Sequence, residues 1–171
     1  MPTATNKHTF HELDELYWFV ERKARREARE NVYLMTLVSL KPQQIVGFDV
    51  AAFDKSPKRI QKIVDNAPEA EHYCTDGWLG YVDVVYPGRH VQNCQDKSDT
   101  FIAGGINADL RHYISVLARR SRCFCRKLET LRAVIEGFTE AYKRFGVAKL
   151  NYSQNRNPNS RKLPFSVLDF L

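Results

Sequence analysis

Long hydrophobic runs are missing from this 171-residue chain. None approaches the roughly 20 apolar residues that a helix needs to cross a bilayer. The first ten residues, MPTATNKHTF, contain no apolar core of the kind that marks a secretory signal. The sequence therefore argues against a membrane-spanning or secreted protein, and we expect a cytoplasmic location.

Several motifs of common catalytic and metal-binding classes are also absent. The four cysteines include no C-x-x-C pair, and the five histidines include no H-x-x-x-H pair, so a zinc site has no support. There is no phosphate-binding G-x-x-x-x-G-K loop, no dinucleotide-binding G-x-G-x-x-G and no hydrolase G-x-S-x-G. We expect the cysteines to be buried packing residues in a reducing compartment.

The composition is that of a folded protein, with 43% hydrophobic and 12% aromatic residues. The length suits one main domain. We assign residues 1–150 to that domain, and residues 151–171 to a basic linker followed by a tail that docks on it. No internal repeat divides the chain further.

Positive charge is concentrated in one stretch of the chain. The net charge is +6, and residues 110–132 hold seven Lys and Arg residues against one acid, Glu129. Such a stretch is the expected footprint of a protein that contacts a phosphate backbone. A solvated helix face is the alternative, and charge alone does not separate the two.

Hydrophobic periodicity predicts five strands and four helices, in the order βββ-α-β-α-β-α-α. The strands are expected at 12–20, 31–40, 45–53, 71–75 and 90–94. The helices are expected at 57–66, 78–86, 106–120 and 128–145. A three-stranded meander followed by a crossover helix predicts an α/β fold, with a mixed five-stranded sheet and helices on both of its faces.

Two aspartates stand in apolar surroundings. Asp14 lies within the strand-like HELDELYWFV, and Asp76 directly follows the strand predicted at 71–75. A carboxylate in a buried strand is costly unless something pairs with it. If the fourth strand lies beside the first, the two carboxylates meet and form a site for Mg²⁺ or Mn²⁺, the arrangement used in two-metal phosphoryl transfer.

Simpler interpretations of these residues exist. Asp14 is also compatible with an ordinary strand-edge acid, and Asp76 with a turn residue, because Asp-Gly is a common turn dipeptide. Asp49 and Asp83 are rival carboxylates that spacing alone does not exclude.

Three segments resemble, in family order, the catalytic half of the DDE transposases of IS-one type insertion sequences. They are ELDELYWFV at 12–20, CTDGWLGY at 74–81 and INADLRHYISVLARRSRCF at 106–124. The resemblance covers residues 12–149. It implies a ribonuclease H-like fold, two Mg²⁺ or Mn²⁺ ions, and metal-dependent cleavage and strand transfer of DNA.

The resemblance also implies which residues form the site. Asp14 and Asp76 match the first two metal-binding acids, and Gly104 stands where the family has its third acid, a Glu. Asp99 and Asp109 are the nearest acids, and neither is a convincing substitute. The residues implied to contact DNA lie on or after the basic helix: Asn107, Arg111, Arg119, Arg120, Arg122 and Arg126. For Asn107, a helix N-cap is the simpler alternative.

The resemblance implies partners as well. They are double-stranded DNA, other copies of the chain assembled on that DNA, and an upstream zinc-finger and helix-turn-helix segment. Either frameshifting joins that segment to this chain, or the chain is a truncated remnant. Three hypotheses follow: an active transposase domain, a DNA-binding relic or regulator that has lost catalysis with the third acid, and a nuclease that cuts without joining.

Overall fold

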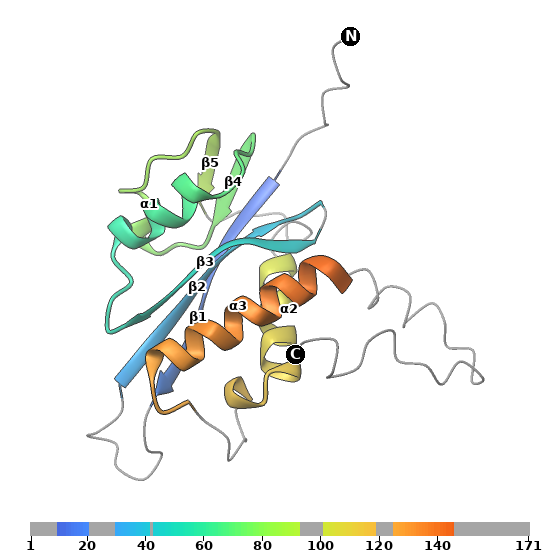
Figure 1. Cartoon of the computed structure of the whole chain (residues 1–171). Coiled ribbons are helices and arrows are strands. Elements are labelled where there is room, and N and C mark those ends of the chain that lie inside the picture. Colours follow the sequence, from blue (N-terminus) through green and yellow to red (C-terminus); the bar gives the residue numbers. More distant parts are fainter. Residues whose placement is uncertain (1–9, 21–29, 42, 93–100, 119–124, 146–171) are drawn as a thin grey trace, which may run out of the picture.

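The computed structural model describes residues 10–20, 30–41, 43–92, 101–118 and 125–145. This part of the chain is an α/β fold with a five-stranded mixed sheet (Figure 1). The strands are β1 (Phe10–Val20), β2 (Glu30–Ser39), β3 (Gln44–Ala52), β4 (His72–Thr75) and β5 (Arg89–Gln92). The helices are α1 (Pro57–Asn66), α2 (Phe101–Tyr113) and α3 (Leu128–Phe145), with 3₁₀ turns η2 (Leu79–Tyr81) and η3 (Ser115–Leu117).

The strand order across the sheet is β3-β2-β1-β4-β5. β1, β2 and β3 form an antiparallel meander, whereas β4 pairs parallel with both β1 and β5. The predicted meander, and the placement of the fourth strand beside the first, are therefore confirmed. β3 and β5 are the two edge strands of this sheet.

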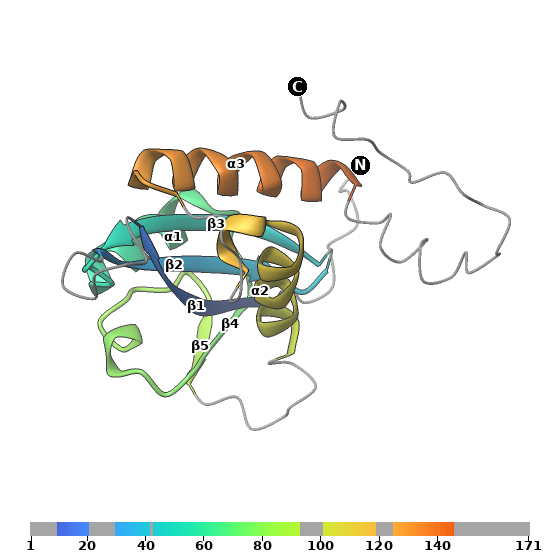
Figure 2. The same cartoon turned by 90° about the horizontal axis from the view of Figure 1, so that it is seen from below.

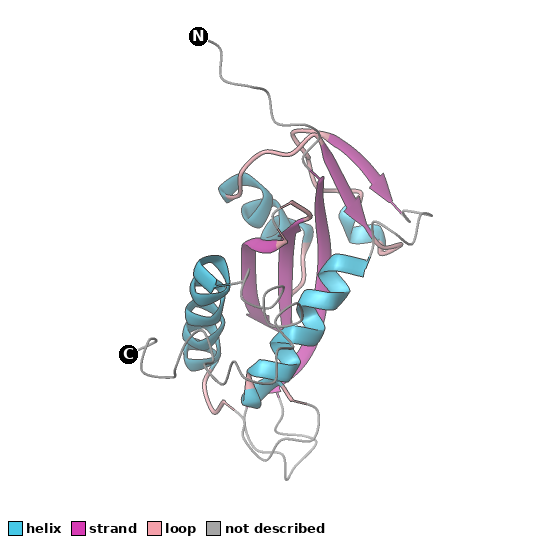
Figure 3. Ribbon diagram, turned by 90° about the vertical axis from the view of Figure 1, so that its right-hand side faces the viewer, coloured by secondary structure: helices cyan, strands magenta, loops and turns pink. Residues whose placement is uncertain are grey.

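Helices cover both faces of the sheet (Figures 2 and 3). α2 and α3 pack on one face through Ile106, Leu110, Leu131 and Ile135, and α3 runs along β3. On the opposite face lie η2 and α1, whose Ile60, Ile63 and Val64 form the buried stripe expected from helical spacing. β2 is buried on both faces, which explains its nearly continuous apolar sequence.

The helix predicted at 78–86 is wrong, because only η2 forms there. The carboxylate of Asp76 accepts the backbone N–H of Trp78 at 2.8 Å, which fixes a turn before η2. A Cβ at Gly80 would lie 2.1 Å from an atom of the Trp78 ring, so the ring closes over this glycine. The segment then continues as turns to Pro87 and Gly88.

The helix predicted at 106–120 lies at different bounds. α2 begins five residues earlier, at Phe101, and ends at Tyr113 before the separate turn η3. Gly104 and Gly105 disfavour a helix in isolation. They lie on its exposed side, however, while Ala103 and Ile106 pack into the core. Tertiary packing therefore overrides the local preference.

The bounds of the remaining helices and strands agree closely with those predicted from the sequence. α3 has its predicted bounds, and the strands differ from theirs by one or two residues. Cys74 and Cys125 are buried, as expected for packing residues. No helix among the described residues is long and apolar enough to span a membrane. Outside the described residues lie the predicted linker and tail at 151–171, and also Cys94 and Cys123.

Candidate functional site

Asp14 lies on β1, and Asp76 is the first residue after the neighbouring parallel strand β4. The register of β1 and β4 pairs Glu12 with Cys74. Two residues further along, Asp14 therefore comes opposite Asp76, the first residue after β4. Side chains alternate along a strand, so the Asp14 carboxylate faces the side on which α2 packs. The Asp76 carboxylate is bound to the N–H of Trp78 in the turn after β4, and it is close enough to act on both Asp14 and Glu15. The prediction that the fold brings these two aspartates together rested on this strand order.

α2 holds the carboxylate of Asp14. The Nδ2 of Asn107 donates a hydrogen bond to Asp14 Oδ2 at 2.7 Å, and the backbone N–H of Glu15 donates to Asp14 Oδ1 at 2.8 Å. Asn107 is only 4% exposed. One turn earlier, the N–H of Ala103 donates to Glu12 Oε2 at 2.9 Å, so two acids of β1 fix the position of α2.

Burial raises the pKa of Asp14 above its ordinary value, and the hydrogen bonds from Asn107 and Glu15 oppose that rise. The negative charge of Asp76 raises the pKa further, while the positive charge of Arg111 lowers it. Asp76 and Arg111 are thus close enough to act on Asp14. A raised pKa means that the folded protein disfavours the carboxylate form, so the charge of Asp14 costs stability at neutral pH.

We predict that Asp14→Asn stabilises the fold at pH 7. An acid with a raised folded-state pKa destabilises the native state above that pKa, and this penalty disappears as the pH falls to the unfolded-state value. The amide oxygen can accept from the N–H of Glu15, and its NH2 can donate to the unpartnered Oδ1 of Asn107 once that side-chain amide turns over. Urea unfolding from pH 3 to 8 should therefore give a wild-type–variant difference that is largest at neutral pH and shrinks in acid. A less stable variant at pH 7 would contradict this account.

Asp76 is exposed to solvent, unlike its neighbour on β1. Its Oδ1 accepts the N–H of Trp78, and Gly77 follows it without a side chain. The carboxylate is therefore fixed in a tight turn at the end of β4 but remains open to a ligand. The turn interpretation and the site interpretation of Asp76 are compatible in this structure.

A third carboxylate, Glu15, lies beside the pair on the opposite face of β1. Its pKa is raised by burial, lowered by Lys55, and raised again by Asp76. Lys55 Nζ lies 3.6 Å from Glu15 Oε1 and 4.1 Å from the centre of the Trp78 ring. Burial and the neighbouring carboxylates raise the pKa of Tyr81, which donates a hydrogen bond to Glu15.

The sequence interpretation did not include these residues in the site. Its only signal for Glu15 was a second acid directly after Asp14 in an apolar strand. Strand alternation places adjacent residues on opposite faces, so this signal does not indicate a joint role. Lys55 gave no pattern at all, because it lies between a strand and a helix.

Gly104 lies on the exposed side of α2, one turn before Asn107. A Cβ built on Gly104 would meet no atom within 4 Å, and the same holds for Gly105. Asp99 lies outside the described residues, and Asp109 is about 160° around α2 from Asn107. Among the described residues, no group of three or more His, Cys, Asp or Glu side chains could hold a metal ion.

The rival acids lie elsewhere. Asp49 is on the edge strand β3, where it pairs with Arg59 and Arg132, and Asp83 is exposed after η2. Asn107 is the seventh residue of α2, so it is not an N-cap. Arg126 is exposed before α3. The other arginines implied to contact DNA, which are Arg119, Arg120 and Arg122, lie outside the described residues.

The sequence matches no protein-family model, and no curated protein matches it. The function must therefore be argued from the geometry of the site.

Proposed function

We propose that this chain is a transposase catalytic domain of the DDE type, built for metal-dependent cleavage and strand transfer of DNA. One observation carries the proposal. Asp14 on β1 and Asp76, the first residue after the parallel neighbour β4, lie close enough for their charges to interact, and a residue of α2 contacts Asp14. Strands and packed helices hold such carboxylates more rigidly than loops do.

The topology supports the same proposal. An antiparallel β1-β2-β3 meander, with parallel β4 and β5 on the far side of β1, is the order expected of a ribonuclease H-like sheet. In that fold the first acid lies within the first strand and the second at the end of the fourth. Asp14 and Asp76 have these positions.

The donor set suits one hard divalent cation. Asp14 and Asp76 offer carboxylate oxygens, and the buried Oδ1 of Asn107 has no hydrogen-bond partner among the described residues. Mg²⁺ and Mn²⁺ prefer such oxygen ligands. A bound cation would polarise a phosphodiester and its attacking oxygen.

The protein's own residues supply the surroundings of that reaction. Asn107 orients Asp14 through the 2.7 Å hydrogen bond, so in this proposal it positions a carboxylate and makes no direct DNA contact. Arg111 places positive charge near the same carboxylate, where it can attract a phosphate. Gly77 lets a substrate backbone approach Asp76 closely.

We predict that Gly104→Glu increases the number or affinity of bound cations. Calorimetric titration with Mn²⁺ should give at most one weak site in the Gly104 protein and tighter or additional binding in the variant. The reason is that a third carboxylate completes the ligand set. Identical titrations for both proteins would contradict a role for position 104 beside Asp14 and Asp76.

A second candidate is a DNA-binding relic or regulator that retains the fold without catalysis. The observation favouring it is the lack, among the described residues, of any three-membered group of potential metal ligands. This candidate binds duplex DNA in a salt-dependent way but does not cleave it with Mg²⁺ or Mn²⁺. Cleavage by the Gly104 protein that disappears in Asp76→Ala would exclude it.

A further inference from the structure

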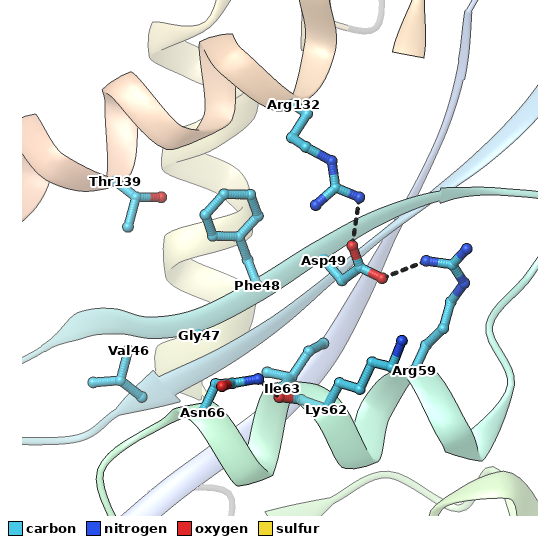
Figure 4. Close-up of a pocket in the computed structure, with 10 residues that line it drawn as sticks. All are labelled: Val46, Gly47, Phe48, Asp49, Arg59, Lys62, Ile63, Asn66, Arg132 and Thr139. Atoms are coloured by element: carbon cyan, nitrogen blue, oxygen red, sulfur yellow. Dashed lines mark hydrogen bonds and ion pairs between the residues drawn. The ribbon is translucent and has the colours of Figure 1, made fainter. Parts of the chain in front are cut away.

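A groove with both polar and apolar lining residues lies at the edge of the sheet formed by β3, away from Asp14. It has a volume of about 500 Å³ and lies between α1 and α3, which pack on opposite faces of the sheet (Figure 4). β2 separates β3 from β1, so the groove is distinct from the candidate site. The residues that matter for its chemistry are Asp49, Arg59, Lys62, Arg132 and Thr139.

The groove has an excess of positive charge. Three of its lining residues are cations, and Asp49 is its one acid. Asp49 lies between two guanidinium groups, 2.7 Å from Arg59 Nη1 and 2.6 Å from Arg132 Nη2. Arg59 also pairs through Nε with Asp54, which does not line the groove, and Arg132 also donates to the carbonyl of Val50. Each guanidinium carries five N–H donors, so these contacts engage only part of them. The arginine side chains are 37% and 44% exposed, so they remain accessible to an anion.

Thr139 provides a second, independent observation. It is only 5% exposed, and its hydroxyl has no hydrogen-bond partner among the described residues. A buried hydroxyl without a partner is unfavourable, so a bound group that hydrogen bonds to it would remove a penalty. In Figure 4 its oxygen lies on the side facing Phe48, which lines the same groove.

The spacing of these groups indicates the kind of ligand. Thr139 follows Arg132 by two helical turns, which corresponds to about 10 Å along α3. A single phosphate ion is too small to contact both ends. A run of linked phosphates spans the distance, and the charge of the groove complements it.

We propose that this groove binds consecutive backbone phosphates of DNA. Arg59, Lys62 and Arg132 contact one part of the backbone, and Thr139 donates its hydroxyl hydrogen to another. Asp49 competes with the phosphates for the two arginines. The choice of DNA as the polyanion rests on the proposed function, whereas the charge and the buried hydroxyl do not depend on it.

The test measures binding of a labelled 20-base-pair duplex by fluorescence anisotropy, without divalent cations and at several salt concentrations. Lys62→Gln should weaken binding about fivefold and lower the slope of log affinity against log salt by about 1. Lys58→Gln is the matched control, because Lys58 is an exposed lysine of the same helix that does not line the groove. It should change binding less than about twofold.

Two further variants separate a binding role from a structural one. Thr139→Val keeps the shape of the side chain and removes the unpartnered hydroxyl. It should weaken duplex binding about tenfold while leaving thermal stability unchanged or higher. Asp49→Asn removes the competing charge and should tighten binding, although it weakens the link between α1 and α3. A variant that merely unfolds would change stability and binding in the same direction.

The outcomes distinguish failure of the groove proposal from failure of the proposed function. Equal duplex binding by wild type, Lys62→Gln and Thr139→Val overturns the groove proposal and leaves the proposed function standing. Inorganic phosphate competing at concentrations similar to those of duplex phosphates would instead indicate a small-anion site and overturn the DNA assignment. Variant-dependent duplex binding supports the groove even if Gly104→Glu shows no cleavage, a result that would count only against the proposed function.

Discussion

Gly104→Glu should give metal-dependent DNA nicking at least about 100-fold above that of the Gly104 protein. The position is open, because no atom lies within 4 Å of a Cβ built there. It is one turn from Asn107, which contacts Asp14 directly. Replacing an exposed helical glycine also favours the helix by about 0.5–1 kcal/mol, so the variant should fold at least as well. Conversion of supercoiled plasmid in Mg²⁺ or Mn²⁺ measures the gain.

The chain offers a closely matched control. Gly105 is likewise exposed, and a Cβ added to it would meet no atom within 4 Å, but it points about 160° away from Asn107 around α2. Gly105→Glu adds the same charge and the same helix preference, and it should not increase nicking. Gly104→Gln, which lacks the charge, should also remain inactive. If Gly104→Glu gains nothing over either control, position 104 is not a lost ligand.

The gain of nicking in Gly104→Glu should also depend on Asp76. Asp76→Ala in the Gly104→Glu background should return nicking to the level of the Gly104 protein, since Asp76 is exposed and close enough to act on Asp14. Nicking that persists in this double variant would mean that another site, or a contaminant, is responsible.

Asn107→Leu should destabilise the protein by about 1–3 kcal/mol at neutral pH. The substitution removes the side-chain donor to a half-buried carboxylate. The pKa of Asp14 is already raised, and Asn107 lowers it, so the variant should raise it further. The added penalty is therefore complete above the folded-state pKa of the variant and declines as the pH falls through it.

A double-mutant cycle isolates this interaction. In the Asp14→Asn background there is no carboxylate to stabilise, so Asn107→Leu should cost less and show little pH dependence. Urea unfolding of the four proteins at pH 4, 5.5 and 7 measures the coupling. Equal costs in both backgrounds at pH 7 would mean that Asn107 acts through packing alone.

Much of the fold was predictable because its signals are local. Alternation and apolar runs located the strands, and the spacing of Ile60, Ile63 and Val64 located α1. The prediction of a helix at 78–86 was wrong because hydrophobic periodicity does not report the contacts that decide this segment. These contacts are the Asp76 turn and the packing of the Trp78 ring over Gly80. The predicted start of α2 was five residues too late, because Gly104 and Gly105 disfavour a helix in isolation and only tertiary packing stabilises one there.

The candidate site was predictable only in part. Asp14 and Asp76 are conspicuous because charged residues are rare in apolar segments. The hydrogen bond between Asn107 and Asp14 joins residues 93 positions apart, and nothing in the local sequence indicates it. The link from Arg59 to Asp49 to Arg132 is of the same kind, since it depends on two helices that meet at an edge strand from opposite faces.

The ion pairs that join Arg59, Asp49 and Arg132 at the edge strand β3 also affect self-association. Arg132 Nη2 donates to the carbonyl of Val50 at 2.7 Å, and the Val50 N–H donates to Asp49 at 2.9 Å. Both outward-facing backbone groups of Val50 on the edge strand β3 are thereby occupied. Another chain cannot extend the sheet past this point by adding a strand, which is a known route to aggregation. Assembly of several copies on one DNA molecule would therefore have to use surfaces other than this part of β3.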